Sequence, residues 1–220
     1  MRMPTVLITG TNRGIGLEFA RQYAADGWDV IATARQASPE LDALGVRVEQ
    51  LDMQDLDAVV ALGGRIEELD LLIANAGTWI PEQAESAADG REWTHMLTVN
   101  AVAPYLLAKS VLRQVGAARG KLMALTSGMG SIAESSGGYV PYRSSKAALN
   151  MAWHSLAIEA KRLGVVAAVL DPGWVKTRMG GANAPTPPEQ SVADMRRLIE
   201  RLGPADSGGF FKRDGSRHDW

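Results

Sequence analysis

Cysteine is absent from this chain of 220 residues. Its absence excludes disulfide bonds, thiol nucleophiles, thiolate metal sites and iron–sulfur clusters. Histidine is scarce as well, with three residues in the chain, His95, His154 and His218. They lie far apart and show no metal-ligand spacing, so we expect no metal site.

An excess of basic charge is also missing. The 23 Lys and Arg residues against 25 Asp and Glu residues give a formal net charge of -2. Such a chain has no electrostatic footprint for nucleic acid or for an anionic membrane surface. No apolar run reaches the ~20 residues of a membrane-spanning helix, and the first residues do not resemble a signal peptide. We therefore expect a cytoplasmic protein that binds neither nucleic acid nor membrane.

Hydrophobic residues, by contrast, make up 46% of the chain, enough for a large core. Short apolar runs alternate with helical patterns, without a repeat or a linker. This alternation predicts βαβ units in one doubly wound α/β domain over residues 1–220, a Rossmann fold with a parallel sheet of about seven strands flanked by helices. The strands are expected at 5–9, 30–33, 46–51, 69–74, 121–125, 165–170 and 209–212.

A glycine-rich turn, Gly10-Thr11-Asn12-Arg13-Gly14-Ile15-Gly16, follows the first expected strand and precedes an amphipathic helix. Strand, glycine turn and helix together are the context of a phosphate-binding loop. Glycines let the backbone approach a pyrophosphate, and the helix N-terminus offers unpaired N–H groups and a partial positive charge. The alternative is a tight turn that binds nothing. The spacing Gly-x-x-x-Gly-x-Gly differs from the Gly-x-Gly-x-x-Gly of long-chain dehydrogenases.

The residues after the second and third strands bear on cofactor choice. In dinucleotide folds an acid after the second strand bonds the ribose 2′-hydroxyl, whereas an arginine there accommodates a 2′-phosphate. Here the acid is absent and Arg35 is present, and Arg13 is a second planar donor. The pattern favours NADP over NAD; the alternative is that both arginines are solvated loop residues. Asp52, after the third strand, either caps the next turn or bonds an adenine amine.

Tyr142 and Lys146 stand four residues apart at the start of a helical pattern, which places a phenol and an ammonium on one helix face. A free phenol titrates near pH ~10, and a neighbouring cation lowers that pKa. The spacing therefore predicts a tyrosine that gives a proton to a substrate oxygen or takes one from it. The alternative is an accidental pair on a solvated helix. Tyr139 is a rival tyrosine, but Arg143 rather than a lysine lies four residues after it.

Two further polar residues are candidates. Ser127 follows the fifth expected strand, at the carboxyl edge of the sheet, where the active residues of doubly wound folds lie. Asn100 falls within a helix expected at 91–115, where asparagine has poor propensity; the alternative is a solvent-facing polar position. Pro104 in the same helix predicts a local kink.

Apolar side chains near the strand ends are candidates for a substrate pocket. Trp79 and Tyr139 follow expected strands, and Trp174 and Met179 belong to a Gly- and Pro-rich segment, 174–188, that has no periodicity and is interpreted as a short lid. The alternative is that they are ordinary core or interface residues. No charged residue stands out as a carboxylate or phosphate anchor, which favours an uncharged carbonyl substrate.

Taken in order, these motifs resemble the short-chain dehydrogenase/reductase family over essentially the whole chain. The residues that carry the resemblance are Thr9-Gly10-x-x-x-Gly14-Ile15-Gly16, Asp52, Asn75-Ala76-Gly77, Asn100, Ser127, Tyr142-x-x-x-Lys146 and Pro172-Gly173. The run 127–131, the Tyr-Arg-Ser-Ser-Lys site and the short C-terminal region also resemble the C-factor and sniffer-type carbonyl reductase branch.

The resemblance implies a catalytic tetrad of Asn100, Ser127, Tyr142 and Lys146. Tyr142 would be the general acid in carbonyl reduction, Ser127 would bond the substrate oxygen, Lys146 would lower the Tyr142 pKa and bond the nicotinamide ribose, and Asn100 would hold a water. The resemblance places the cofactor on Gly10, Asn12, Arg13, Gly14, Ile15, Gly16, Arg35, Asp52, Met53, Asn75, Ala76, Gly77, Tyr142, Lys146, Pro172, Gly173 and Val175.

Three departures from the family pattern are visible. Ala74 replaces the first asparagine of a frequent Asn-Asn-Ala-Gly. Ser127 lies fifteen residues before Tyr142, a little more than the common spacing, so Ser131, eleven before it, is a rival catalytic serine. Asp171 stands where the family often has asparagine.

We therefore expect an NADPH-dependent enzyme that reduces a small aldehyde or ketone reversibly. The alternatives are a catalytically silent NADP-binding sensor and a structural partner-binding module. Family members are often dimers or tetramers packed through the helices expected here at 91–115 and 144–163, so a homodimer or homotetramer is expected, although the smaller branch can be monomeric.

Overall fold

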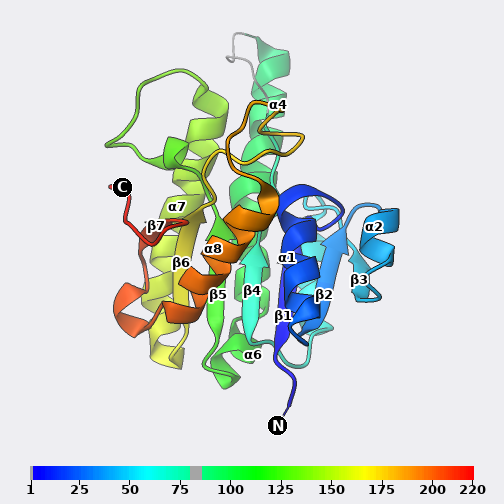
Figure 1. The fold of residues 1–220 in the computed structure, drawn as a ribbon. Helices are drawn as coiled ribbons and strands as arrows, with labels where there is room; N and C mark the ends of the chain where they lie inside the picture. The colour runs from blue at the N-terminus through cyan, green and yellow to red at the C-terminus, as the bar shows by residue number, and fades with distance from the viewer. Residues whose placement is uncertain (1, 80–85) are drawn as a thin grey trace.

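A single parallel sheet organises the molecule (Figure 1). The computed structural model describes residues 2–79 and 86–220. Its strands are β1 (Thr5–Thr9), β2 (Asp29–Ala34), β3 (Arg47–Gln50), β4 (Leu71–Ala74), β5 (Lys121–Leu125), β6 (Val166–Asp171) and β7 (Phe210–Lys212). The order in the 7-stranded sheet is β3-β2-β1-β4-β5-β6-β7. From β1 the chain first adds β2 and β3 on one side and then returns to add β4 to β7 on the other, as in a doubly wound Rossmann fold. The predicted fold class is confirmed.

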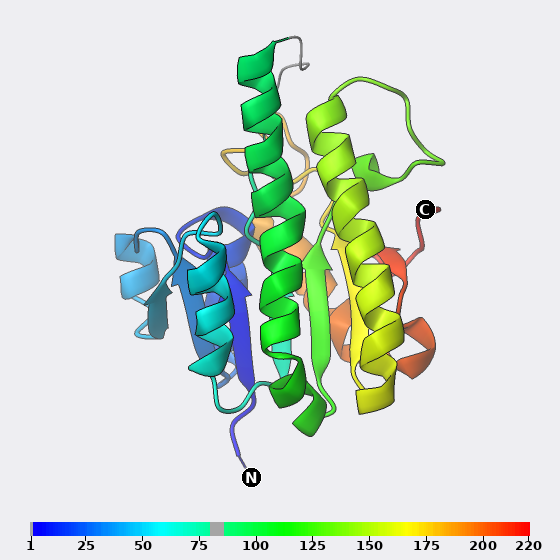
Figure 2. The ribbon, with the colours of Figure 1, turned by 180° about the vertical axis from the view of Figure 1, so that it is seen from behind.

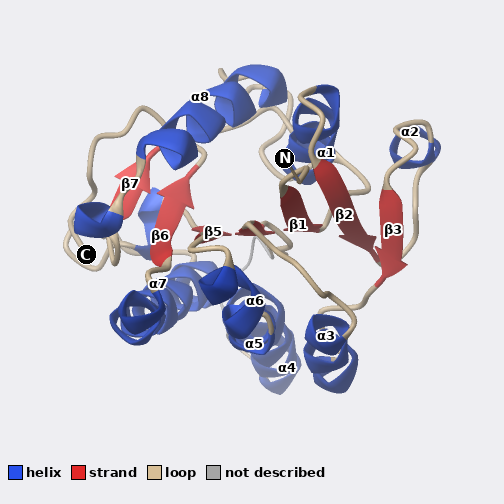
Figure 3. Cartoon of the chain, turned by 90° about the horizontal axis from the view of Figure 1, so that it is seen from below, coloured by secondary structure: helices blue, strands red, loops and turns tan. Residues whose placement is uncertain are grey.

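Helices cover both faces of the sheet, which gives three layers (Figure 3). The helices are α1 (Gly14–Ala25), α2 (Pro39–Asp42), α3 (Leu56–Gly64), α4 (Ala87–Leu97), α5 (Ala103–Ser110), α6 (Leu112–Ala117), α7 (Val140–Ala160) and α8 (Pro188–Arg201). α1 and α8 pack side by side on one face, while α3, α5 and α7 lie on the other (Figures 2 and 3). Among the described helices none is both long and apolar enough to cross a bilayer.

Each face of the sheet has its own hydrophobic core, because successive strand residues point to opposite sides. Along β1, Leu7 belongs to the core under α3, α5 and α7, whereas Val6 and Ile8 belong to the core under α1 and α8. All three side chains are 0% exposed. Strands buried on both sides in this way read as continuous apolar runs, which explains why the sequence predicts the bounds of the buried strands to within one or two residues.

The single helix expected at 91–115 is in fact interrupted. α4 ends at Leu97, a π-helical segment spans Thr98–Val102, and α5 follows. Pro104 has no backbone N–H, so the carbonyl of Asn100 lacks its ordinary α-helical donor four residues on. The irregularity therefore lies one turn before the proline, around Asn100, where π-segments often mark functional positions.

The helix expected at 144–163 also begins earlier, at Val140, so that Tyr142 lies in the first turn of α7. Three consecutive residues with positive φ precede it: Gly137 (79°), Gly138 (67°) and Tyr139 (48°). A left-handed conformation is uncommon for a residue with a side chain. This run turns the chain from the loop after β5 into α7.

Candidate active site and cofactor cleft

A cavity of about 880 Å³ lies along the carboxyl ends of β1, β2, β4, β5 and β6. It is lined by Gly10, Asn12, Arg13, Gly14, Ile15, Gly16, Thr33, Ala34, Arg35, Leu51, Asp52, Met53, Asn75, Ala76, Gly77, Thr78, Trp79, His95, Val99, Leu125, Thr126, Tyr142, Lys146, Pro172, Lys176, Thr177, Arg178, Met179 and Pro188. Ligands of doubly wound sheets bind at this edge. Of the residues expected to hold the cofactor, all but Gly173 and Val175 line it.

The glycine turn forms the floor of this cleft because side chains cannot fit there. Gly10 has φ +71°, and a Cβ on it would lie 2.9 Å from the Cα of Ala76. A Cβ on Gly16 would overlap the carbonyl oxygen of Gly10 and the amide of Asn75. Asn75 donates from Nδ2 to the carbonyls of Thr9 (2.8 Å) and Gly10 (3.1 Å), so its amide ties the end of β4 to the loop. The resulting bare backbone at a helix N-terminus fits a pyrophosphate.

The far end of the cleft carries the residues expected to select the cofactor. Arg13 and Arg35 both line the cavity and are exposed, and within the described part of the chain neither guanidinium forms an ion pair. Asp52 Oδ1 accepts a hydrogen bond from the backbone of Gln54 (3.0 Å), and Asp52 also lines the cavity. The turn-capping interpretation of Asp52 is therefore confirmed, while its position keeps an oxygen available to a ligand.

Tyr142, Lys146 and Ser127 come together at the other end. Lys146 is 5% exposed, donates from Nζ to the Leu125 carbonyl (2.9 Å), and lies 5.8 Å from the centroid of the Tyr142 ring. Ser127 lies close enough to Tyr142 for its side chain to lower the pKa of the phenol through hydrogen bonding. Ser131 instead accepts from the backbone of Glu134 (3.0 Å) and is 2% exposed, so Ser127 is the serine beside the phenol.

The electrostatics of this group differ from the sequence expectation. Burial and, to a smaller extent, the charge of Asp171 raise the pKa of Tyr142 to about 12, although the hydrogen bond from Ser127 acts in the opposite direction. Burial also lowers the pKa of Lys146 to about 8. The lowering of the Tyr142 pKa expected from Lys146 is thus wrong for this structure, because burial and the charge of Asp171 raise that pKa, while the ammonium of Lys146 is bonded to the Leu125 carbonyl.

Asn100 is fully buried and its amide is occupied. Oδ1 accepts from the backbone N–H of Thr78 (2.8 Å), and Nδ2 donates to the Thr78 carbonyl (2.9 Å) and to Ser145 Oγ (3.0 Å). The side chain therefore joins the segment after β4 to α7. A Cβ on Gly77 would lie 3.3 Å from Asn100 Oδ1 and 3.8 Å from Lys146 Nζ, so the asparagine lies close to the buried lysine.

The residues expected to contact substrate divide into two groups. Trp79 and Met179 line the cavity, and the Trp79 ring lies 6.2 Å from that of Tyr142. Tyr139 packs on Trp79 at 5.8 Å but lies outside the lining, and Trp174 is 59% exposed.

Sequence reasoning missed three basic side chains of the lining, His95, Lys176 and Arg178. Lys176 and Arg178 belong to the segment 174–188, whose lack of periodicity gave no signal of where they would point.

Comparison with known proteins decides the family. A family model described as short chain dehydrogenase matches residues 4–187. The chain is a short-chain dehydrogenase. C-signal of Myxococcus xanthus is 41% identical to it over 155 residues, which are 69% of this chain and 92% of that protein.

Solved structures of carbonyl reductases resemble this short-chain dehydrogenase over its full length. Sniffer of Drosophila melanogaster has a TM-score of 0.92 at 30% identity, with 100% of both chains covered. An NADPH-bound carbonyl reductase from chicken fatty liver has a TM-score of 0.89 at 28% identity, again with 100% of both chains covered. This short-chain dehydrogenase is therefore an NAD(P)-dependent oxidoreductase with neighbours that are carbonyl reductases.

Proposed function

We propose that the enzyme reduces a small, uncharged aldehyde or ketone with NADPH and oxidises the corresponding alcohol in reverse. The observation that carries this proposal is the convergence of Tyr142, Ser127 and Lys146 beside a cleft with a bare glycine floor. When bound, the nicotinamide supplies the hydride. Tyr142 donates the proton to the carbonyl oxygen, and Ser127 donates a hydrogen bond to the same atom, where negative charge grows in the transition state.

Lys146 and Asn100 support this proton transfer. The buried ammonium of Lys146 is proposed to bond the nicotinamide ribose and to favour the phenolate of Tyr142 once its environment is completed by ligand. Asn100 is proposed to hold a water near Lys146, since its carbonyl has no α-helical donor and Lys146 lies close to its side chain.

The decisive experiment replaces Tyr142 by phenylalanine. Y142F keeps the ring and removes the proton donor, so carbonyl reduction should fall by about 10³-fold or more. The NADPH affinity, followed by fluorescence titration, should stay within about twofold. Y139F is the matched control, because that tyrosine lies outside the cavity lining, and it should keep most of the activity. Equal activity of Y142F and wild type would refute the proposal.

For the cofactor, we propose a preference for NADP. It is supported by the guanidinium groups of Arg13 and Arg35 on the cavity wall, neither of which forms an ion pair with the residues that the structure describes. R35D should reverse part of this preference, because a carboxylate repels a 2′-phosphate and bonds a ribose hydroxyl. The ratio of kcat/KM with NADPH to that with NADH should fall by at least about tenfold. An unchanged ratio would exclude Arg35 from cofactor selection.

For the substrate, a carbonyl panel followed by NADPH consumption would test the proposed class. The panel needs matched neutral and carboxylated aldehydes and ketones, because Lys176 and Arg178 line the same cavity. Higher kcat/KM for the neutral member of each pair supports the proposal. Consistent preference for the carboxylated member would show that the two lid cations select the substrate.

The proposed setting is the cytoplasm, and the proposed assembly is a homodimer or homotetramer. On α7, Met151 and Ile158 are 66% and 67% exposed, an apolar surface that association would cover. Light scattering would give the mass, and a monomer at micromolar concentration would refute the assembly. Cell fractionation would test the location.

A further inference from the structure

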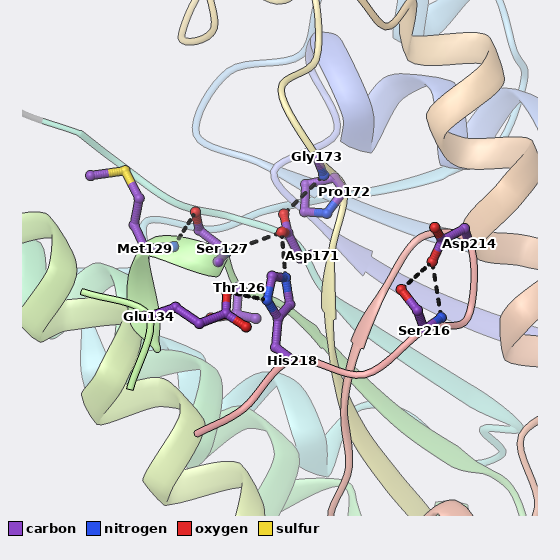
Figure 4. A network of polar contacts seen from close by, with 12 residues as sticks. Thr126, Ser127, Met129, Glu134, Asp171, Pro172, Gly173, Asp214, Ser216 and His218 are labelled. Carbon is purple, nitrogen blue, oxygen red and sulfur yellow. Dashed lines mark hydrogen bonds and ion pairs between the residues drawn. The ribbon is translucent and has the colours of Figure 1, made fainter. Parts of the chain in front are cut away.

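A buried histidine lies between two carboxylates directly beside the proposed active site (Figure 4). The side chain of His218 is 6% exposed. Its Nε2 lies 2.9 Å from Asp171 Oδ2, and its Nδ1 lies 2.9 Å from Glu134 Oε2. Asp171 ends β6, Glu134 belongs to the loop after β5, and His218 belongs to the segment that follows β7. Three segments far apart in the sequence therefore meet on one imidazole ring.

A carboxylate oxygen faces each nitrogen of this ring. An ionised carboxylate accepts hydrogen bonds and donates none, whereas a neutral imidazole has one donor and one acceptor nitrogen. The neutral ring can therefore donate to one of the two carboxylates, and the protonated ring can donate to both. The hydrogen bond from His218 in turn lowers the pKa of Glu134. The ring also packs on Phe210, with centroids 4.4 Å apart.

The same cluster holds the backbone next to Ser127. Asp171 Oδ2, which accepts from His218, also accepts from the N–H of Gly128 (3.1 Å). A Cβ on Gly128 would lie 2.9 Å from Cε1 of His218, so the ring is in contact with the residue that follows Ser127. Glu134 lies further along the same loop. His218 thus fixes that loop at two points, through Asp171 before the turn and through Glu134 after it.

The Asp171 carboxylate of this cluster also interacts electrostatically with Tyr142. The charge of Asp171 raises the pKa of Tyr142 and that of Lys146, so the carboxylate is close enough to both groups to affect their protonation. A cation paired with Asp171 offsets this influence, because the two charges partly cancel at a distance.

We propose that His218 is a positioning residue for the reaction proposed above: its protonated ring holds the loop that carries Ser127 and offsets the charge of Asp171 beside Tyr142. The inference rests on the proposed carbonyl reduction. Nearby charged groups are Lys212 of β7, which acts on Glu134, and Lys146 of α7. Neither contacts the ring, whereas Glu134 and Asp171 bond it directly.

The test measures the pH profile of alcohol oxidation by the NADP-bound enzyme, in which Tyr142 acts as a base and the rate rises as the phenol loses its proton. In that state Lys146 is proposed to favour the phenolate, which brings the Tyr142 pKa below its ligand-free value of about 12. H218Q leaves Asp171 without a cation, so the Tyr142 pKa rises and the rising limb moves to higher pH. For the loss of one neighbouring charge, we expect the pH at which the rate rises to move by about half to one unit. At pH values below this rise, the oxidation rate of H218Q should then be about three- to tenfold lower than that of wild type. The affinity for NADPH should not change.

The double variant D171N/H218Q separates charge from simple packing. It removes both charges, so its limb should return to lower pH than that of H218Q. H218K, which keeps a cation, should stay nearer to wild type than H218Q does. If His218 only filled space, H218Q would lower the rate without moving the limb, and the limb of the double variant would coincide with that of D171N. That result, or coincident limbs of H218Q and wild type, would overturn the proposal.

D171N alone provides a second route that spares the ring and is needed if H218Q does not fold. Removal of the carboxylate charge should move the limb below that of wild type, and coincident limbs would again overturn the proposal. Wild-type activity distinguishes this failure from that of the proposed function. If wild type shows no carbonyl reduction and no alcohol oxidation, the proposed function itself is refuted.

Discussion

Lys146 should make the stability of this protein depend on pH in an unusual direction. The side chain is 5% exposed, and burial lowers its pKa from 10.5 to about 8. Below pH 8 the folded and unfolded states both carry the proton, so the folded state bears the full cost of a buried ammonium. Between pH 8 and 10.5 the unfolded chain binds the proton more tightly, and the free energy of unfolding must therefore rise with pH.

The size of the effect follows from the shift. One pKa unit corresponds to ~1.4 kcal/mol, so the change from 10.5 to about 8 corresponds to about 3 kcal/mol. The replacement K146M removes the titrating group while it keeps an apolar stem of similar length. The difference in unfolding free energy between wild type and K146M should accordingly rise by about 2 to 3 kcal/mol between pH 7 and pH 10.

Urea denaturation of both proteins, purified without nucleotide, at pH 7, 8, 9 and 10 would measure this difference. The window ends at pH 10 because the raised pKa values of Tyr23 and Tyr142, both about 12, act in the opposite sense above it. A group whose folded pKa is raised loses its stabilising contribution as pH rises. A difference that stays constant over the window would show that Lys146 is not desolvated as described.

Three further substitutions test the site and the core. G16A should weaken NADPH binding by at least about tenfold in a fluorescence titration, because its methyl group overlaps the Gly10 carbonyl, whereas G90A, with open space around it, should bind normally. S127A should lower kcat about 100-fold, while S131A should keep it within about threefold; the reverse order would assign the role to the rival serine. W153A removes a side chain that is 1% exposed and should lower the free energy of unfolding by about 3 to 5 kcal/mol in denaturant melts, so a loss below about 1 kcal/mol would contradict the packing.

The strands of the sheet could be predicted from the sequence because each strand is marked by the residues within it and directly beside it. β5 was predicted at 121–125 and is found at Lys121–Leu125, since a strand buried on both faces must be an apolar run between turn residues. The glycine turn could be predicted as well, because glycine is the residue that tolerates positive φ and close contact with a neighbouring backbone. The break at Asn100 was predicted in part: Pro104 indicated a kink, but it did not indicate that a π-helical segment packed against α7 would form one turn before it.

The part of the site that depends on tertiary contacts could not be predicted. The direction of the Tyr142 pKa was wrong because the Tyr-x-x-x-Lys spacing says nothing of how deeply the phenol is buried. Asp171 was noted without an interpretation, since its partner His218 lies 47 residues away in the sequence. Pairings of this kind are set by how β6, β7 and the loop after β5 meet, which periodicity does not encode.

The tie between Asn75 and the glycine turn has a consequence for how cofactor use evolves. Its hydrogen bonds to Thr9 and Gly10 hold the loop by contacts within the protein itself. Little of the binding free energy of a dinucleotide would therefore be needed to order this part of the backbone. The side chains of Arg13 and Arg35 line the same cavity and, among the described residues, form no hydrogen bond with this loop. Preference for one nicotinamide coenzyme over the other is thus a separable trait, open to exchange by substitutions that leave the frame untouched.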